Sequence, residues 1–344
     1  MLGILLPVIL IYVFSVFNLI GIKKELLFIH LFYFAVGLVG FILVRYIGNK
    51  FFKQNSIFFY WFFVGMLIVT YIIGAEVKGS QRWIDLGFTR FQPSEFFKIF
   101  FILFLADFYS RKRRFDNASL YFLKGFIYFL IPTFIIFKEP DLGSAMVLVV
   151  IYIVMTLFSG IPKKYIFYLI LITTLTLPVS WHFLHDYQKS RFLAFVNFHI
   201  KNENASYNMT QAIITSGSGQ LAGRGLAMGK QSKLYFLPEY HTDFAFSSLV
   251  EQFGFVGGGT VIALYLVISF FILYKLYELY KNFDTHKFQF LYIAGFFSFV
   301  FFQIVVNVGM NLGIVPIAGI TLPLVSYGGS SLIAFFIGLG FMFE

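Results

Sequence analysis

Apolar residues occur along this chain in long windows that are separated by short polar stretches. A helix of about 20 apolar residues crosses a hydrocarbon core roughly 30 Å thick, so each window predicts a membrane-spanning helix. The ten predicted spans are residues 3–20, 26–46, 57–75, 95–110, 119–137, 143–160, 165–184, 244–275, 288–310 and 330–343. The fourth and the last of these windows are short, and the eighth is long.

The spans define the fold class, which is an all-α polytopic membrane protein. Backbone amides and carbonyls in lipid must find partners within their own segment, and a helix meets this requirement. We therefore expect one transmembrane domain over residues 1–344, with a large extracytoplasmic loop at about 185–243 between spans 7 and 8. No basic residue precedes the first window and no small-residue cleavage site follows it, so we expect it to stay as a span.

Composition agrees with this class. The chain is 59% hydrophobic and 12% charged, whereas soluble domains average about 25% charged residues. The absence of cysteine excludes disulfides, thiolate metal sites and thiol catalysis. Most of the +10 net charge lies next to the predicted spans, which suits anionic lipid and membrane topology and argues against nucleic-acid binding.

The positions of Lys and Arg predict the orientation. Short loops count most for topology, and the even-numbered loops are short and carry twelve cations. These are Arg45, Lys50, Lys53, Arg111, Lys112, Arg113, Arg114, Lys163, Lys164, Lys275, Lys281 and Lys287. We therefore expect the even loops and both termini to be cytoplasmic, and the long loop to face outward.

Polar residues that are unusual for a membrane protein gather on the predicted outward side. The first cluster covers residues 74–98 and includes Arg82 and Trp83. Within it, Ser94 resembles a helix N-cap. Glu95 and Lys98 are three residues apart, so they share a helical face and can pair. They form either a structural ion pair or part of the lining of a polar cavity below the outer surface.

The second cluster lies between the fifth and sixth spans. Pro140 bars a continuous helix, so the carboxylates of Glu139 and Asp141 sit at a break. Breaks at membrane depth are tolerated where they line a wet cavity. The alternative interpretation is an exposed turn with solvated acids.

The third cluster is a glycine-rich segment at residues 216–231. No strand precedes its glycines and no Gly-Lys-Ser/Thr sequence follows them, which argues against a nucleotide-binding loop. Its backbone amides, together with Arg224 and Lys230, are candidates to hold a pyrophosphate in a nest. A flexible loop is the alternative.

The fourth cluster contains Glu239, His241 and Asp243, with Glu251 further along the eighth span. Asp243 and Glu251 are eight residues apart and so lie roughly on one helical face. A carboxylate at the boundary between water and lipid can have its pKa shifted by desolvation or by a cation, which makes it a candidate general base. The structural alternative is that Asp243, or Thr242 in its place, is the N-cap of the eighth span.

The fifth cluster runs from Asn307 to Asn311 and then through a segment rich in Gly and Pro. This segment predicts a re-entrant outward loop, and Ser330 and Ser331 are expected to cap the last helix. Elsewhere, His182 and His185 have helical spacing but no third ligand nearby, so we predict no metal site there.

Together and in this order, the five clusters resemble the SEDS family of bacterial cell-wall polymerases (shape, elongation, division and sporulation proteins), over nearly the whole chain. The matching motifs are Arg82-Trp83-Ile84, Gln92-Pro93-Ser94-Glu95 with Lys98, Pro140-Asp141-Leu142-Gly143, Leu237-Pro238-Glu239 with His241-Thr242-Asp243-Phe244, and Leu322-Pro323 with Ser326-Tyr327-Gly328-Gly329-Ser330. The segments Gly217-Ser218-Gly219 and Gln231-Ser232 resemble the elongation branch of the family more than the division branch. The chain departs from the usual pattern at Glu139, where Gln is commoner, and at Glu251-Gln252, where two Glu are typical.

The resemblance implies a peptidoglycan glycosyltransferase that polymerises lipid II during cell elongation, at the outer face of the bacterial cytoplasmic membrane. Asp243 is the expected general base. The expected substrate-binding residues are Arg82, Trp83, Glu95, Lys98, Glu139, Asp141, Arg224, Glu239, His241 and Ser330. The other expected ligand is undecaprenyl-pyrophosphate-linked glycan, and the expected partner is a class B penicillin-binding protein, a transpeptidase. No cofactor is certain, and a divalent cation, Mg²⁺ or Mn²⁺, is a candidate for holding the pyrophosphate.

Two other functions fit part of the pattern. Broken helices and buried charge also suit a transporter, in particular a lipid II flippase. A non-catalytic scaffold for cell-wall assembly is the third option. A carrier needs charge that is accessible from both faces, so the gathering of polar residues on one side favours the polymerase.

Overall fold

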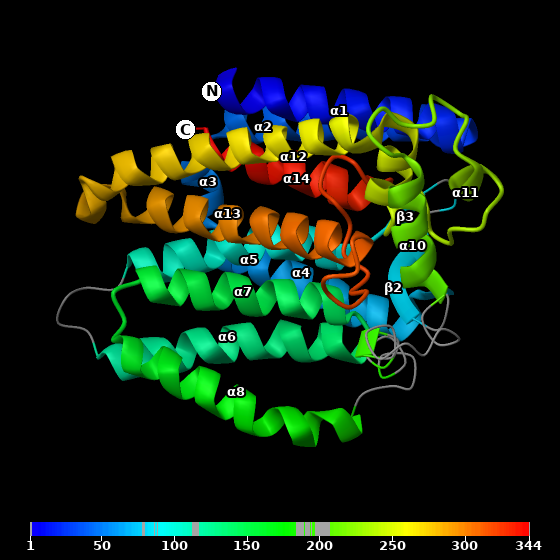
Figure 1. Cartoon of the computed structure of the whole chain (residues 1–344). Helices are drawn as coiled ribbons and strands as arrows, with labels where there is room; N and C mark the ends of the chain where they lie inside the picture. Colours follow the sequence, from blue (N-terminus) through cyan, green and yellow to red (C-terminus); the bar gives the residue numbers. More distant parts are fainter. Residues whose placement is uncertain are drawn as a thin grey trace. The chain divides into compact units, whose positions relative to one another are not determined.

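A computed structural model describes residues 2–77, 80–85, 87, 89–111, 117–183, 189, 193, 195, 196 and 207–343. In this part of the chain, ten helices have at least 14 residues, and each contains most of one predicted span (Figure 1). They are α1 (Leu2–Ile22), α2 (Leu27–Ile47), α4 (Ser56–Ile73), α5 (Pro93–Ser110), α6 (Ala118–Lys138), α7 (Leu142–Phe158), α8 (Lys163–Phe183), α12 (Ala245–Tyr280), α13 (Phe283–Asn311) and α14 (Gly329–Met342). The predicted fold class, a polytopic helical membrane protein, is confirmed.

Among the described residues, six helical stretches are long and apolar enough to cross a membrane, judged by length and composition. They correspond to α1, η1 with α2, α4, α6, α12 and α13, while α7 and α14 are shorter apolar helices. The short helices are η1 (Lys24–Leu26), α3 (Asn49–Gln54), α10 (Tyr207–Ser218) and α11 (Lys230–Lys233). The last two lie in the segment predicted as one long loop, and much of residues 184–206 lies outside the described residues.

A small antiparallel sheet was not predicted from the sequence. It contains β1 (Ala75–Val77), β2 (Ser80–Asp85) and β3 (Arg90–Phe91), in the order β1-β2-β3. Trp83 pairs with Ala75, and Ile84 pairs with Phe91. The sheet lies between α4 and α5 in the chain, and β2 contacts both of these helices.

The chain divides into two compact units. Unit 1 comprises Met1–Val36, Asp186–Leu273 and Phe301–Leu332, and unit 2 comprises Gly37–His185, Tyr274–Val300 and Ile333–Glu344. The helices α2, α12, α13 and α14 contribute residues to both units.

The core of unit 2 is built around α5. This helix packs against α4, α6 and α7, and 16 of its 18 residues are buried. Figure 1 shows α6, α7 and α8 side by side in the same unit. Because protein surrounds α5 on nearly all sides, it carries Glu95, Lys98 and Asp107 without exposing them to lipid. This burial explains why its apolar window in the sequence is short.

The long helix α12 has a break in the part that belongs to unit 1. α12 has 36 residues, and Gly254 leaves helical geometry with a φ of 67°. The segment 220–225 supplies partners for the backbone groups that the break leaves open, as the chain must when a helix is interrupted inside a protein. The bonds are Arg224 N to Glu251 O (2.9 Å), Gly225 N to Gln252 O (3.1 Å), Phe255 N to Gln220 O (2.8 Å) and Val256 N to Leu221 O (3.1 Å).

A buried polar network joins α1 to α12 within unit 1. The Asn18 amide donates to the Ser248 hydroxyl over 3.1 Å, and the Gln252 amide donates to Asn18 Oδ1 over 2.6 Å. All three side chains are buried. Satisfied polar groups of this kind fix the register of two helices, because a shift would leave the groups without partners.

Candidate active site

The loop of residues 239–243, called the Asp243 loop here, lies immediately before α12. Its turn begins at Glu239, which adopts a left-handed φ of 50°. The backbone amides of Thr242 and Phe244 both donate to the Glu239 carbonyl, each over 3.1 Å. The Thr242 hydroxyl also donates to Glu239 Oε2 over 2.9 Å. Left-handed backbone is uncommon outside glycine, and such strain gathers at functional sites.

Two asparagines of α13 hold the backbone of Asp243. The side-chain amides of Asn307 and Asn311 each donate to the Asp243 carbonyl over 3.1 Å. Both asparagines are fully buried. Asn311 Oδ1 in turn accepts from the Ser247 amide and hydroxyl at the start of α12, over 2.9 and 2.6 Å. The position of Asp243 is therefore set by side chains that themselves have fixed partners.

The segment after α13 supplies a second anchor. The Tyr327 amide donates to the His241 carbonyl over 2.8 Å, and the Ser326 hydroxyl donates to the Thr242 carbonyl over 2.6 Å. Three successive carbonyls of the Asp243 loop are thus held by other parts of unit 1. The side chain of Asp243 is half-buried, which is the environment expected for a carboxylate that must meet a substrate.

The two asparagines and Ser326 are functional candidates that are not among the site residues predicted from the sequence. The sequence does contain a signal for the two asparagines, because Asn307 and Asn311 are one helical turn apart in an apolar helix. Polar side chains on one face of such a helix need a partner.

Three predicted helix caps are wrong. α12 begins at Ala245, so the position before it is Phe244 and neither Thr242 nor Asp243. α5 has Gln92 at its N-cap and Pro93 in its first turn, because proline is preorganised for a first helical position, and Ser94 is already helical. α14 begins at Gly329, which places Ser330 and Ser331 inside its first turn.

The glycine-rich segment is neither a phosphate nest nor a flexible loop at the residues next to α12. The amides of Arg224 and Gly225 donate to carbonyls of that helix, as described above, and the Gly223 amide donates to the Gly219 carbonyl over 2.8 Å. These amides already have acceptors and cannot also hold an anion. The side chain of Arg224 is exposed, and its role in substrate binding stays a prediction.

Glu251 fixes the neighbouring segment. Its carboxylate accepts from the Gln231 amide over 2.8 Å, and from the Ser232 amide and hydroxyl over 3.0 and 2.6 Å. The side chain is buried. With three donors engaged, this carboxylate holds α11 against α12, and we assign it a structural role rather than that of a base.

In unit 2, Arg82 of β2 bridges to the break between α6 and α7. Its guanidinium lies 3.6 Å from Asp141 Oδ1 and donates to the carbonyls of Glu139 and Pro140. Asp141 is also the N-cap of α7, because its Oδ1 accepts from the Ser144 amide over 3.2 Å. Glu139 and Asp141 are buried, so the alternative interpretation, an exposed turn with solvated acids, is wrong.

Glu139 is a carboxylic acid in an environment that disfavours charge. Burial and the neighbouring Asp141 carboxylate raise its pKa to about 8, against a smaller opposing effect from Arg82. Among the described residues, nothing donates a hydrogen bond to its buried Oε1. At neutral pH most of this side chain is therefore protonated, which makes it equivalent in charge to a glutamine.

We expect Glu139→Gln to remove a pH dependence of stability. At pH values between 4.5, the ordinary pKa of this carboxyl, and about 8, its pKa in the folded protein, the folded protein keeps a proton that the unfolded chain releases. Stability of the natural protein therefore falls as pH rises through this window, by at most about 5 kcal/mol, and then levels off. Thermal melting in detergent at pH 5.5 and pH 9 measures this effect. The melting temperature of Glu139→Gln minus that of the natural protein should therefore increase with pH, and a constant difference would contradict the assignment. The control is Glu278→Gln, which changes an exposed carboxylate.

The predicted pair of Glu95 and Lys98 is confirmed. Lys98 Nζ donates to Glu95 Oε1 over 2.7 Å, and both side chains are buried. The ammonium also lies 5.4 Å from the centre of the Phe299 ring. Within the described part of the chain, Glu95 Oε2 is buried and accepts no hydrogen bond.

The predicted site residues thus fall into two groups. Unit 1 contains Glu239, His241 and Asp243 on one short loop, with Arg224 upstream and Ser330 at the start of α14. Unit 2 contains Arg82, Trp83, Glu95, Lys98, Glu139 and Asp141. Trp83 lies half-buried in β2. Among the residues the structure describes, no three His, Asp or Glu side chains are grouped to hold a metal ion, and the divalent cation stays a prediction.

Comparisons with known proteins identify the family. The family model for FtsW, RodA and SpoVE, described as cell cycle proteins, matches residues 1–344. The peptidoglycan glycosyltransferase MrdB of Escherichia coli K12 is 34% identical over 310 residues, which cover 89% of this chain and 81% of that protein.

Solved structures agree with this match. One, described as showing the structural coordination of polymerization and crosslinking by a peptidoglycan synthase complex, is 26% identical, with a TM-score of 0.79 over 99% of this chain and 95% of the other. The rod shape determining protein RodA of Thermus thermophilus has the same fold, with 24% identity and a TM-score of 0.73 over 99% of this chain and 95% of its own. A helical membrane fold, an ordered set of polar motifs and these matches lead to one assignment: the chain belongs to the FtsW/RodA/SpoVE family.

Proposed function

We propose that this membrane enzyme is a peptidoglycan glycosyltransferase that polymerises lipid II at the outer face of the bacterial cytoplasmic membrane, with both of its termini in the cytoplasm. In the reaction, the 4-hydroxyl of a lipid II sugar attacks the anomeric carbon at the end of the growing strand. A glycosidic bond forms, the bond to the diphosphate breaks, and undecaprenyl pyrophosphate leaves. The names of its relatives support this assignment.

The single observation that carries the mechanism is the anchoring of the Asp243 loop. A general base must be held within hydrogen-bond reach of the proton that it removes, and small displacements cost much of the rate. The carbonyls of residues 241, 242 and 243 are each fixed by a partner outside the loop. We infer that this frame positions the Asp243 carboxylate to accept the proton of the attacking hydroxyl.

The departing pyrophosphate needs positive charge. In unit 2, Arg82 is paired with Asp141, and Lys98 is paired with Glu95 inside the protein. The exposed guanidinium of Arg224 is therefore the better candidate for a direct phosphate contact among these three. A divalent cation, Mg²⁺ or Mn²⁺, is the other means of neutralising a leaving diphosphate.

A partner is also proposed. One solved structure similar to this chain is of a complex that coordinates polymerization with crosslinking. We infer that a class B penicillin-binding protein, a transpeptidase, cross-links the strands that this chain makes. The similarity of residues 217–219 and 231–232 to the elongation branch of the family favours a role in cell elongation.

Glycan synthesis by the purified protein tests the function. The full chain in detergent is given labelled lipid II, alone and with a class B penicillin-binding protein, and products are separated on a gel. A ladder of glycan strands is expected. Detergent has no compartments, so a flippase, like a scaffold, would leave lipid II unchanged. Unchanged lipid II with and without the partner would contradict the proposal.

A further inference from the structure

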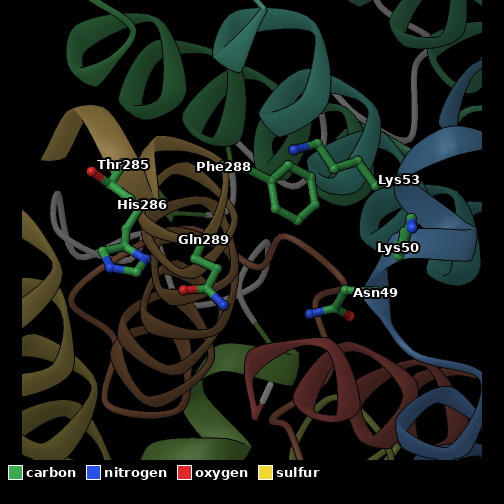
Figure 2. Close-up of a pocket in the computed structure, with 7 residues that line it drawn as sticks. All are labelled: Asn49, Lys50, Lys53, Thr285, His286, Phe288 and Gln289. Atoms are coloured by element: carbon green, nitrogen blue, oxygen red, sulfur yellow. The ribbon is translucent and has the colours of Figure 1, made fainter. Parts of the chain in front are cut away.

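A cavity of about 310 Å³ lies in unit 2 where α3 meets the first turns of α13 (Figure 2). Its lining residues are Asn49, Lys50, Lys53, Thr285, His286, Phe288 and Gln289. This volume is at the lower end of the range of small-ligand sites, so it suits a headgroup rather than a sugar chain. None of these residues belongs to either group of predicted site residues, so the catalytic proposal does not use this cavity.

The chemistry of the lining favours an anion. Lys50 and Lys53 provide two cations, and the lining also offers donors from the Thr285 hydroxyl, the His286 ring and the Gln289 amide. No carboxylate lines the cavity, and the nearest acid in sequence, Asp284, is exposed in the first turn of α13. Within the described part of the chain, neither Lys50 nor Lys53 forms an ion pair.

Both walls of the cavity are fixed by other parts of unit 2. Asn49 is buried, and its amide donates to the Phe341 carbonyl over 2.9 Å, which sets the start of α3. Opposite, His286 leaves helical geometry (φ −105°, ψ 20°), so its turn is offset from the rest of α13. Figure 2 shows Asn49 and Gln289 facing each other across the cavity, with Lys53 extended over Phe288. Lys53 Nζ lies 4.7 Å from the centre of that ring.

The surroundings of the cavity point to lipid as the source of the anion. The cavity lies just beyond the end of α2, a helix long and apolar enough to cross a membrane, and at the start of α13, which is another. Large apolar side chains next to it in sequence, Ile47 and Phe51, are about half exposed and offer a surface for acyl chains. Basic pockets between membrane helices bind the phosphates of anionic lipids.

We propose that this cavity binds the phosphate of an anionic phospholipid headgroup. In this arrangement Lys50 and Lys53 neutralise the phosphate, the hydroxyl of Thr285 and the amide of Gln289 donate hydrogen bonds, and the acyl chains lie along Ile47 and Phe51. A free phosphate compound would satisfy the same donors but would make no use of the apolar surface, and this difference separates the two sources by experiment.

Lipid binding to the purified full chain tests the proposal. Native mass spectrometry gives apparent Kd values for dioleoyl-phosphatidylglycerol and dioleoyl-phosphatidylcholine. We expect tighter binding of phosphatidylglycerol by the natural protein, and a loss of this preference by about 5- to 25-fold in the double variant Lys50→Gln/Lys53→Gln. The matched control is Lys163→Gln/Lys164→Gln, which removes the same charge from exposed lysines at the start of α8 and should change binding less than about twofold.

Other measurements keep the result decisive. Thr285→Glu places an acid in the cavity from the opposite wall at an exposed position, and should weaken phosphatidylglycerol binding even if the lysine variant folds poorly. Inorganic phosphate and glycerol phosphate at millimolar concentration should not displace the lipid. The proposal is overturned by equal binding in the natural protein and the double variant, by equal weakening in the control, or by displacement with either soluble phosphate.

Discussion

Asp243→Asn is expected to abolish glycan polymerisation, with kcat lowered by about 10²- to 10⁴-fold. Asparagine has nearly the size of aspartate but cannot accept the proton of an attacking hydroxyl at neutral pH. The bonds from Asn307 and Asn311 reach the backbone carbonyl of residue 243, so the substitution leaves them intact. The loss should therefore appear in kcat, while the melting temperature of the purified protein stays unchanged.

The measurement is the rate of glycan synthesis from labelled lipid II by the purified variant, with the proposed partner, a class B penicillin-binding protein, added. Asp284→Asn, which changes an exposed carboxylate in the first turn of α13, is the matched control and should keep the full rate. Polymerisation by Asp243→Asn at the natural rate would rule out this residue as the base. A variant that melts early would assign Asp243 to the structure of the loop instead.

Lys98→Met is expected to cause the largest loss of stability, about 3–5 kcal/mol. Methionine is an unbranched side chain only one heavy atom shorter than lysine, but it leaves the buried Glu95 carboxylate without its cation. A charge in a buried site without a partner is far more costly than the pair itself. The double variant Glu95→Gln/Lys98→Met removes both charges and should recover most of the lost stability.

Thermal melting of the natural protein, the single variants Glu95→Gln and Lys98→Met, and the double variant gives the coupling energy of the pair. Lys163→Met removes an exposed lysine from the start of α8 and should change stability by less than about 0.5 kcal/mol. If Lys98→Met melts like this control, the ion pair does not support the core of unit 2. If the double variant melts as early as Lys98→Met, the loss comes from packing around residue 98.

The helices of this fold were predictable, because hydrocarbon imposes a minimum apolar length on each span. The charged start of α5 could also be found, since Glu95 and Lys98 at a spacing of three residues must share a helical face. What hydropathy did not indicate is that α5 is buried by protein rather than lipid. The predicted N-cap of α5 is also wrong. Serine favours the N-cap position, but the backbone of Pro93 is already suited to the first helical position, which makes Gln92 the N-cap.

The sequence predicts which residues form the candidate site, but not which hydrogen bonds they make. Long-range partners decide what each polar group does, and sequence spacing does not reveal them. The spacing of eight residues groups Glu251 with Asp243 as a potential base, yet the Glu251 carboxylate accepts hydrogen bonds from two backbone amides about 20 residues upstream. Likewise, the glycine-rich composition near Arg224 suggests backbone amides that are free to bind an anion. In the structure, the amides of Arg224 and Gly225 donate to carbonyls at the break in α12.

That break has a genetic consequence. A side chain at Gly254 would meet the Gly223 amide nitrogen at 2.3 Å, and a side chain at Gly223 would meet the Gly254 nitrogen at 2.7 Å. In most close packing, an enlarged residue can be accommodated when its neighbour becomes smaller. Here the obstructing atoms are backbone on both sides, so a smaller neighbouring side chain makes no room, and we expect neither glycine to tolerate substitution while the two segments stay paired.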